Sequence, residues 1–219
     1  MNDFDKDLKN KTLAELRALT DQLDQKRYIA DYIFSFIHEK NVTAIDGITP
    51  LSKAFRNQLT DDGFYISSLA VEDKRIDPDG TIKYLLRLPD GKSIETVLLS
   101  DKDRRTLCVS TQVGCAMGCG FCATGKIKLQ RDLSAAEIAD QVYALCRDKQ
   151  KINNVVFMGM GEPLLNYDNT LKAVRILNHS NGRNIGIRHL TVSTCGIVPA
   201  VYQLAGEDIV PRLAVYLNA

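Results

Sequence analysis

The half of the chain that follows Arg104 alternates short apolar runs with segments in which apolar residues recur at helical spacing. The runs are TLCVSTQ, NNVVFMG, IRHLTVST and PRLAVYL, and the helical patterns lie at 134–148, 169–178 and 198–204. Successive parallel strands need a crossover connection, usually a helix, so this alternation predicts βαβ units and a parallel sheet. We count about four such strands, and the predicted fold class is α/β.

Two other patterns come before this region. Residues 1–62 are predicted to form a small helical accessory domain, because Thr12 and Glu15 have the spacing of a capping box and leucines then recur at helical spacing. Residues 63–103 show strand-like alternation broken by the turn signals DPDG and PDG, which predicts a β-meander. Residues 104–219 are then the α/β core, so we expect three segments.

The composition, 45% hydrophobic and 25% charged, suits a soluble globular protein. The N-terminus, MNDFDKDLKNK, is charged, and no apolar run approaches the roughly 18 residues of a membrane span. We therefore expect neither a signal peptide nor a membrane anchor, and a cytoplasmic location.

The formal net charge of +1 neither favours nor excludes a nucleic-acid partner, so a polyanion site would have to be a local patch. Basic residues gather on both sides of a cysteine-rich loop and again later in the chain. On one mouth of the fold they could bind phosphates, whereas scattered surface charge is the alternative. They are Lys102, Arg104, Arg105, Lys126, Lys128, Arg131, Arg183 and Arg188.

Three of the six cysteines, Cys115, Cys119 and Cys122, fall within eight residues, in a loop that contains glycines and follows a predicted strand. In a reducing compartment such clustering indicates metal or redox chemistry rather than disulfides. Three thiolates can hold an iron–sulfur cluster with one iron left open. A tetrahedral zinc site needs a fourth ligand, and no histidine lies within thirty residues on either side. The spacing therefore favours iron–sulfur over zinc, and over three unbound thiols.

The CxxxCxxC loop, with Phe121 before its last cysteine, resembles that of the radical S-adenosylmethionine (SAM) superfamily. Its wider context, TLCVSTQVGCAMGCGFCATG followed by NVVFMGMGEPLLN and TVSTCGIVP, resembles the dual-specificity 23S rRNA/tRNA adenine-C2 methyltransferases. The resemblance implies a partial (β/α) TIM-like barrel of the radical-SAM type and a [4Fe–4S] cluster on the three cysteines. It also implies that SAM binds the open iron and is cleaved to a 5′-deoxyadenosyl radical. The implied partners are RNA (23S rRNA and tRNA) as substrate and an electron donor such as flavodoxin.

The same resemblance implies roles for five further residues. Gly161 and Glu162 would hold the amino group of SAM, and Ser193 would contact SAM. Cys108 would resolve a covalent intermediate between protein and RNA, and Glu95 would be a general base. Without the family resemblance, Gly161 and Glu162 would belong to an ordinary turn and Ser193 would be a capping hydroxyl. Cys108 would be a core cysteine and Glu95 a solvent-facing carboxylate.

The remaining cysteines, Cys146 and Cys195, are expected to be structural. The family pattern continues past residue 219 and includes a methyl-carrying cysteine that has no match here. The family also reads S-L-H-A where this chain has Tyr216, Leu217, Asn218 and Ala219, so the resemblance does not assign a SAM contact to Tyr216 or Asn218.

The early end of the chain leads us to expect an incomplete barrel whose last strand is an exposed, aggregation-prone edge. The expected activity is that of the methyltransferase. Two alternatives are a truncated product that cleaves SAM without methyl transfer and a non-catalytic, metal-containing RNA-binding fragment.

Overall fold

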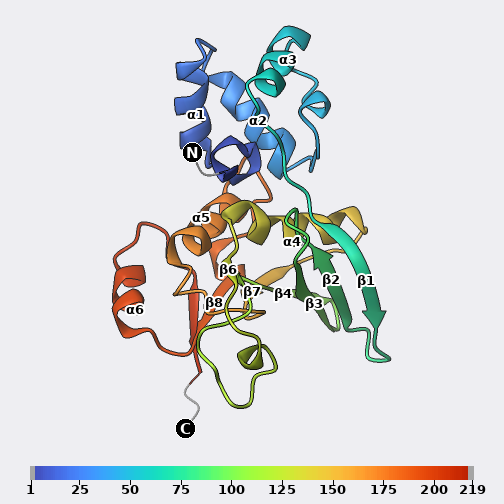
Figure 1. Cartoon of the computed structure of the whole chain (residues 1–219), viewed down its shortest axis with the longest axis vertical. Coiled ribbons are helices and arrows are strands. Elements are labelled where there is room, and N and C mark those ends of the chain that lie inside the picture. The colour runs from blue at the N-terminus through green and yellow to red at the C-terminus, as the bar shows by residue number, and fades with distance from the viewer. Residues whose placement is uncertain (1–2, 217–219) are drawn as a thin grey trace.

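The computed structural model of the chain describes residues 3–216, and it places a helical unit above a mixed α/β unit (Figure 1). The helical unit has its own apolar core, built from side chains between Leu8 and Ile66. The capping box is confirmed: the Thr12 hydroxyl accepts from the N–H of Glu15, whose carboxylate accepts from the N–H of Thr12. The elements are η1 (Asp3–Lys6), η2 (Leu8–Asn10), α1 (Leu13–Gln22), α2 (Tyr28–His38), η3 (Ile45–Gly47) and α3 (Lys53–Asp61).

One seven-stranded sheet follows, in the order β1-β2-β3-β4-β7-β8-β9. The first four strands pair antiparallel, which confirms the meander, and β4, β7, β8 and β9 pair parallel, which confirms the βαβ expectation. The sheet therefore runs without a break from the meander into the core, while the exact segment boundaries stay predictions. The strands are β1 (Ala70–Ile76), β2 (Ile82–Arg87), β3 (Ser93–Asp101), β4 (Arg104–Val109), β7 (Asn154–Phe157), β8 (Leu190–Thr194) and β9 (Arg212–Val215).

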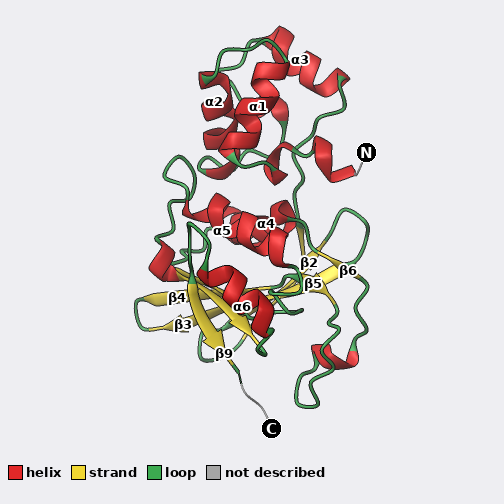
Figure 2. Cartoon of the chain, turned by 90° about the vertical axis from the view of Figure 1, so that its left-hand side faces the viewer, coloured by secondary structure: helices red, strands yellow, loops and turns green. Residues whose placement is uncertain are grey.

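Helices α4 (Ala135–Arg147) and α5 (Tyr167–Asn178) lie between the sheet and the helical unit, whereas α6 (Val198–Ala205) lies near β9 (Figure 2). A helix on the surface buries one stripe, but every residue of α4 from Ala135 to Leu145 is buried. It is buried all round because the sheet covers one side and the helical unit covers the other. Its predicted capping box, Ser134 with Glu137, is also confirmed.

A buried polar junction joins the helical unit to α4. Lys9, which is 0% exposed, places its Nζ 2.5 Å from Asp140 Oδ1 and also donates to the carbonyl of Ser67. His38 Nδ1 lies 2.9 Å from the hydroxyl of Tyr143, which is also fully buried. Burial, and then the nearby Lys9 ammonium, lower the pKa of His38 to about 3. The junction fixes the two units relative to one another through charged and polar contacts.

A two-stranded hairpin, β5 (Gln112–Val113) with β6 (Arg131–Asp132), lies outside the main sheet. It holds the neck of a long loop, residues 114–130, that contains the 3-10 turn η4 (Thr124–Lys126). A further 3-10 turn, η5 (Ile187–His189), leads into β8. Among the described residues, none of the helices has both the length and the apolar character that crossing a membrane requires.

Candidate functional site

The cysteine loop, residues 114–130, is shaped by its backbone rather than by its side chains. The N–H of Cys115 donates to the carbonyl of Ile127, and the N–H of Cys122 donates to the carbonyl of Cys119, each at 3.1 Å. Gly114 has a φ of +81°, and a Cβ added there would lie 2.2 Å from a backbone oxygen of Lys128. Only glycine fits this close approach, so the glycine fixes the fold of the neck.

The thiols of Cys115, Cys119 and Cys122 are half-buried on this loop. Burial raises the pKa of Cys115, and the neighbouring Cys119, Cys122 and Glu162 raise it further, so these groups lie near one another. Among the residues that the structure describes, no three acidic, histidine or cysteine side chains are already gathered as a metal site. Three cysteine sulfurs on one loop are the type of ligand that binds a [4Fe–4S] cluster. Their role as ligands stays a prediction.

Glu162 follows the end of β7 and is 4% exposed. Its carboxylate accepts from the N–H of Leu164 at 3.0 Å and from the N–H of Cys195 at 2.9 Å. The two bonds tie the loop after β7 to the end of β8 and orient the carboxylate. Each oxygen keeps lone-pair capacity for a further donor, such as an ammonium group.

Gln112 holds the backbone of Glu162 in place, and no sequence pattern predicted this role. Its side-chain carbonyl accepts from the N–H of Glu162 at 2.9 Å, while its amide donates to Asp132 at 2.7 Å. Gly161 has a φ of +98°, and a Cβ there would lie 2.5 Å from the Cβ of Gln112. A lone glutamine in an apolar run carries no sequence signal for such a role.

Ser193 and Cys195 lie where β8 ends. Ser193 is 7% exposed and pairs in register with Ala214 of β9. Cys195 is half-buried, and its thiol lies against Glu162; burial, and then Glu162, raise its pKa to about 11. Cys146, in contrast, packs against the main apolar core from α4. The expectation that Cys195 is structural stays a prediction, and its thiol lies beside Glu162.

Cys108 and Glu95 share the face of the sheet that points away from α4, here called the open face. Cys108 alternates on β4 with the fully buried Leu107 and Val109, and it pairs in register with Val97, two residues from Glu95. Burial raises the pKa of the Cys108 thiol to about 11. The structure thus brings these two predicted residues onto adjacent strands.

Glu95 is not a free carboxylate. Its Oε1 lies 2.5 Å from Lys83 Nζ, and both side chains are 47% exposed. Its backbone carbonyl accepts from the hydroxyl of Ser110 at 2.6 Å, and that hydroxyl accepts from the N–H of Met160 at 2.9 Å. Through Ser110 the position of Glu95 is linked to the loop that carries Gly161.

Two further predictions concern Tyr216 with Asn218 and the basic residues. Tyr216 lies just after β9, with its hydroxyl 3.6 Å from Met158 Sδ, whereas Asn218 lies outside the described residues. Of the two alternatives for the basic residues, the structure contradicts the one in which all of them share one mouth of the fold. Arg104 begins β4, and Lys102 and Arg105 lie beside it. The loop with Lys126 and Lys128 follows the other end of β4, so these two groups of basic residues lie at opposite ends of the parallel sheet.

Comparisons with known proteins agree with this geometry. Residues 109–219 match the family model of the radical SAM superfamily. Residues 1–63 match that of the ribosomal RNA large subunit methyltransferase N-terminal domain. A solved structure, a radical SAM methyltransferase from Sphaerobacter thermophilus, superposes with a TM-score of 0.88 at 43% identity, over 97% of this chain and 64% of that chain.

Curated relatives are similar over nearly the whole chain. The probable dual-specificity RNA methyltransferase RlmN of Dictyoglomus turgidum is 48% identical over 94% of this chain and 60% of its own length. The dual-specificity RNA methyltransferase RlmN of Geotalea uraniireducens is 46% identical over 97% of this chain and 61% of its own length. The family resemblance is confirmed, and the chain spans about 60% of the length of these relatives.

Proposed function

The chain belongs to the radical SAM superfamily, and from this premise we propose that it is an RNA methyltransferase acting on C2 of adenine in 23S rRNA and tRNA. SAM serves both as methyl donor and as the source of a 5′-deoxyadenosyl radical. The names of the relatives support the reaction class, and the match of residues 1–63 to a ribosomal RNA methyltransferase domain supports the substrate class. We assign it to the cytoplasm, with an electron donor such as flavodoxin.

The observation that carries this proposal is the convergence of separate elements at the carboxyl ends of β4, β7 and β8. The cysteine loop, Glu162 and Cys195 meet there, and Glu162 binds the end of β8 directly. Active sites of barrel enzymes lie at this end of their parallel strands. The open face carries Cys108 and Glu95 toward the same end.

Each residue then has a defined task. Cys115, Cys119 and Cys122 would hold the cluster, which when bound supplies the electron for reductive cleavage of SAM. Glu162 would accept the SAM ammonium group in a charge-assisted hydrogen bond, in a position fixed by two backbone N–H groups. Gly161 keeps the backbone close to Gln112, and Ser193 would offer a hydroxyl to SAM from the end of β8.

Glu95 and Cys108 would act on the RNA. Glu95 would take a proton from the modified base, and Lys83 orients its carboxylate for that step. The thiol of Cys108, with a pKa of about 11, is almost entirely protonated at neutral pH. It needs a base to become a nucleophile, because the thiolate is the reactive form.

The test is direct. The anaerobically reconstituted chain is incubated with a reductant, methyl-labelled SAM and an RNA fragment, and the digested RNA is analysed for labelled 2-methyladenosine. We expect this product from the wild-type chain and none from Cys119→Ala. A cluster-loaded chain that gives no 2-methyladenosine would refute the proposal.

A second candidate function is SAM cleavage without methyl transfer. The cysteine loop and Glu162 favour it, because they would hold the cluster and SAM, which are what the cleavage of SAM requires. In the same assay this candidate predicts 5′-deoxyadenosine with unlabelled RNA.

A further inference from the structure

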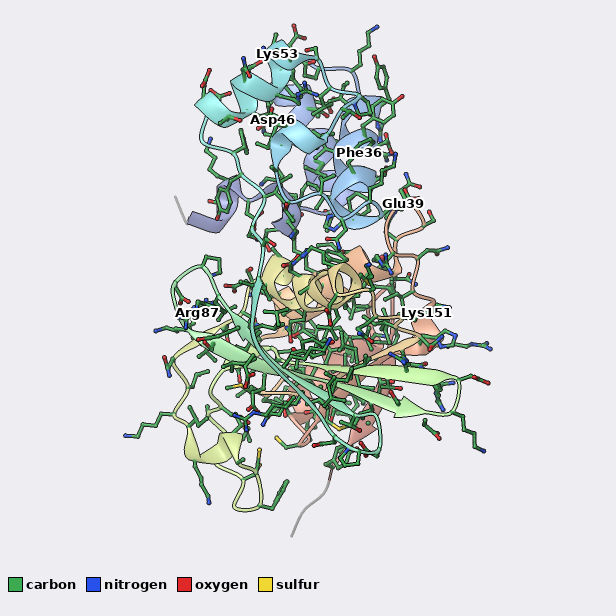
Figure 3. The ribbon with its side chains drawn as sticks, turned by 90° about the vertical axis from the view of Figure 1, so that its right-hand side faces the viewer. Phe36, Glu39, Asp46, Lys53, Arg87 and Lys151 are labelled. Atoms are coloured by element: carbon green, nitrogen blue, oxygen red, sulfur yellow. The ribbon has the colours of Figure 1, made fainter. Side chains whose placement is uncertain are left out.

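A hollow of about 650 Å³ lies at the amino ends of the parallel strands, away from the cysteine loop. Figure 3 shows Lys151, which precedes β7, at the opposite end of the strands from Arg87 and the cysteine loop. The hollow is formed where β3 turns into β4 and where β7, β8 and β9 begin. We call it the basic basin, and it is lined by Asp101, Lys102, Asp103, Arg104, Asn153, Asn154, Arg188, His189 and Arg212.

The basin carries more positive than negative charge. Its four cations outnumber its two carboxylates, an excess of two charges in a chain whose net charge is +1. In the part of the chain that the structure describes, none of the four has a carboxylate within 4.0 Å, and all four are exposed. Seven arginines elsewhere do have such a partner: Arg17, Arg56, Arg75, Arg87, Arg131, Arg147 and Arg175.

The amide and imidazole side chains of the basin are held in place by their own hydrogen bonds. The side-chain carbonyl of Asn153 accepts from the N–H of Arg105 at 2.8 Å, and the N–H of Asn153 donates back to the carbonyl of Arg105 at 2.9 Å. His189 Nδ1 lies 2.8 Å from Asn154 Oδ1. The frame is therefore fixed, whereas the four cations keep their donors for a ligand.

We propose that the basic basin binds backbone phosphates of the RNA substrate. This inference rests on the proposed function. Three of the four cations are arginines, whose planar guanidinium groups match phosphate oxygens in pairs. The six residues of β4 separate the basin from the cysteine loop by roughly 20 Å. An RNA strand in helical form covers that distance with on the order of six nucleotides, so one substrate can contact both ends.

An acidic redox protein is the other partner that fits positive charge. A partner that delivers electrons has to approach the cysteine loop, at the other end of the sheet. This favours RNA at the basin.

The experiment compares two double variants that each remove two positive charges. Arg188→Gln with Arg212→Gln changes the basin, and Lys26→Gln with Lys53→Gln changes exposed cations of the helical unit (Figure 3 shows Lys53 far from Lys151). Binding of a fluorescent RNA hairpin is followed by anisotropy from about 50 to 200 mM salt. Circular dichroism and thermal melting confirm that both variants fold.

We expect the basin variant to bind the hairpin about tenfold more weakly, with a salt slope lower by roughly 1.5 to 2, and the control to change far less. Equal losses in both variants would overturn the proposal, because the effect would be one of overall charge. So would a basin variant that loses inorganic tripolyphosphate or an acidic flavodoxin but still binds RNA normally.

The assay contains neither SAM nor a reductant, so it separates this inference from the proposed function. If the wild type binds RNA and the basin variant binds it equally well, the proposal for the basin is refuted and the proposed function is not. Loss of binding in the basin variant supports the basin whether or not the chain methylates RNA. A wild-type chain that does not bind RNA refutes the basin and the proposed substrate together.

Discussion

The polar junction under the helical unit and the cysteine loop beyond the sheet both carry reactive or charged side chains, yet they are built in opposite ways. At the junction, Lys9 and Asp140 are buried and bind each other and backbone groups, and Asp140 also pairs with Arg147. In the loop, the backbone makes the hydrogen bonds that fix the shape, and the thiols are left half-exposed. The junction uses its polar groups to hold the fold, whereas the loop keeps its sulfur atoms for a ligand.

The largest expected effect is at the junction. Lys9→Met should reduce the free energy of unfolding by about 3 kcal/mol, because the buried Asp140 loses its ammonium partner and keeps only Arg147 as a cation. The control is Lys172→Met, which breaks an exposed ion pair with Glu15 between the same two units and should cost at most about 1 kcal/mol. Urea denaturation measures both. Equal, small losses would show that the junction does not hold the units together.

A second, smaller effect concerns Glu162, the ordered carboxylate beside the loop. Glu162→Gln keeps a side-chain oxygen for one backbone N–H but removes the charge that would meet an ammonium group. We expect SAM to bind the reconstituted protein about 1.5 to 3 kcal/mol more weakly, with little loss of iron. Anaerobic calorimetry measures the affinity, and Glu207→Gln is the control. An unchanged affinity would reject the SAM contact.

A third effect is the pH dependence of stability that arises from His38 at the polar junction. His38 has a folded pKa of about 3 against 6.5 unfolded, so the unfolded chain binds more protons between these values and stability falls as pH falls from about 6.5. The expected loss from this group is about 2 kcal/mol between pH 7 and pH 5. His38→Gln should flatten this part of the curve, and the exposed His189→Gln should not. Parallel curves for wild type and His38→Gln would contradict the assignment.

How much of this could be predicted from the sequence depends on the distance between partners along the chain. The capping boxes, Thr12 with Glu15 and Ser134 with Glu137, lie three residues apart and were predictable from local spacing. Lys9 and Asp140 are separated by 131 residues, and no local pattern chooses one carboxylate among many.

The basic residues show that nearness in sequence does not place residues on one surface. Arg104 and Cys115 are close in sequence, but β4 runs between them and separates them by a strand length. The sequence left a single phosphate-binding surface and scattered charge as alternatives, and only the structure decides between them. The family motif supplied the site residues, while Gln112 and the Lys83 partner of Glu95 became visible only through their contacts.

The central claim is that the cysteine loop serves a ligand and not the fold, and iron binding tests it most directly. Cys119→Ala and, as control, Cys146→Ala are reconstituted anaerobically beside the wild type, and iron is counted together with the visible absorbance of a cluster. We expect about four irons per chain in the wild type and in Cys146→Ala, and none that is stable in Cys119→Ala. The apo forms of wild type and Cys119→Ala should differ in stability by no more than about 0.5 kcal/mol. Equal iron in Cys119→Ala and Cys146→Ala would contradict the account.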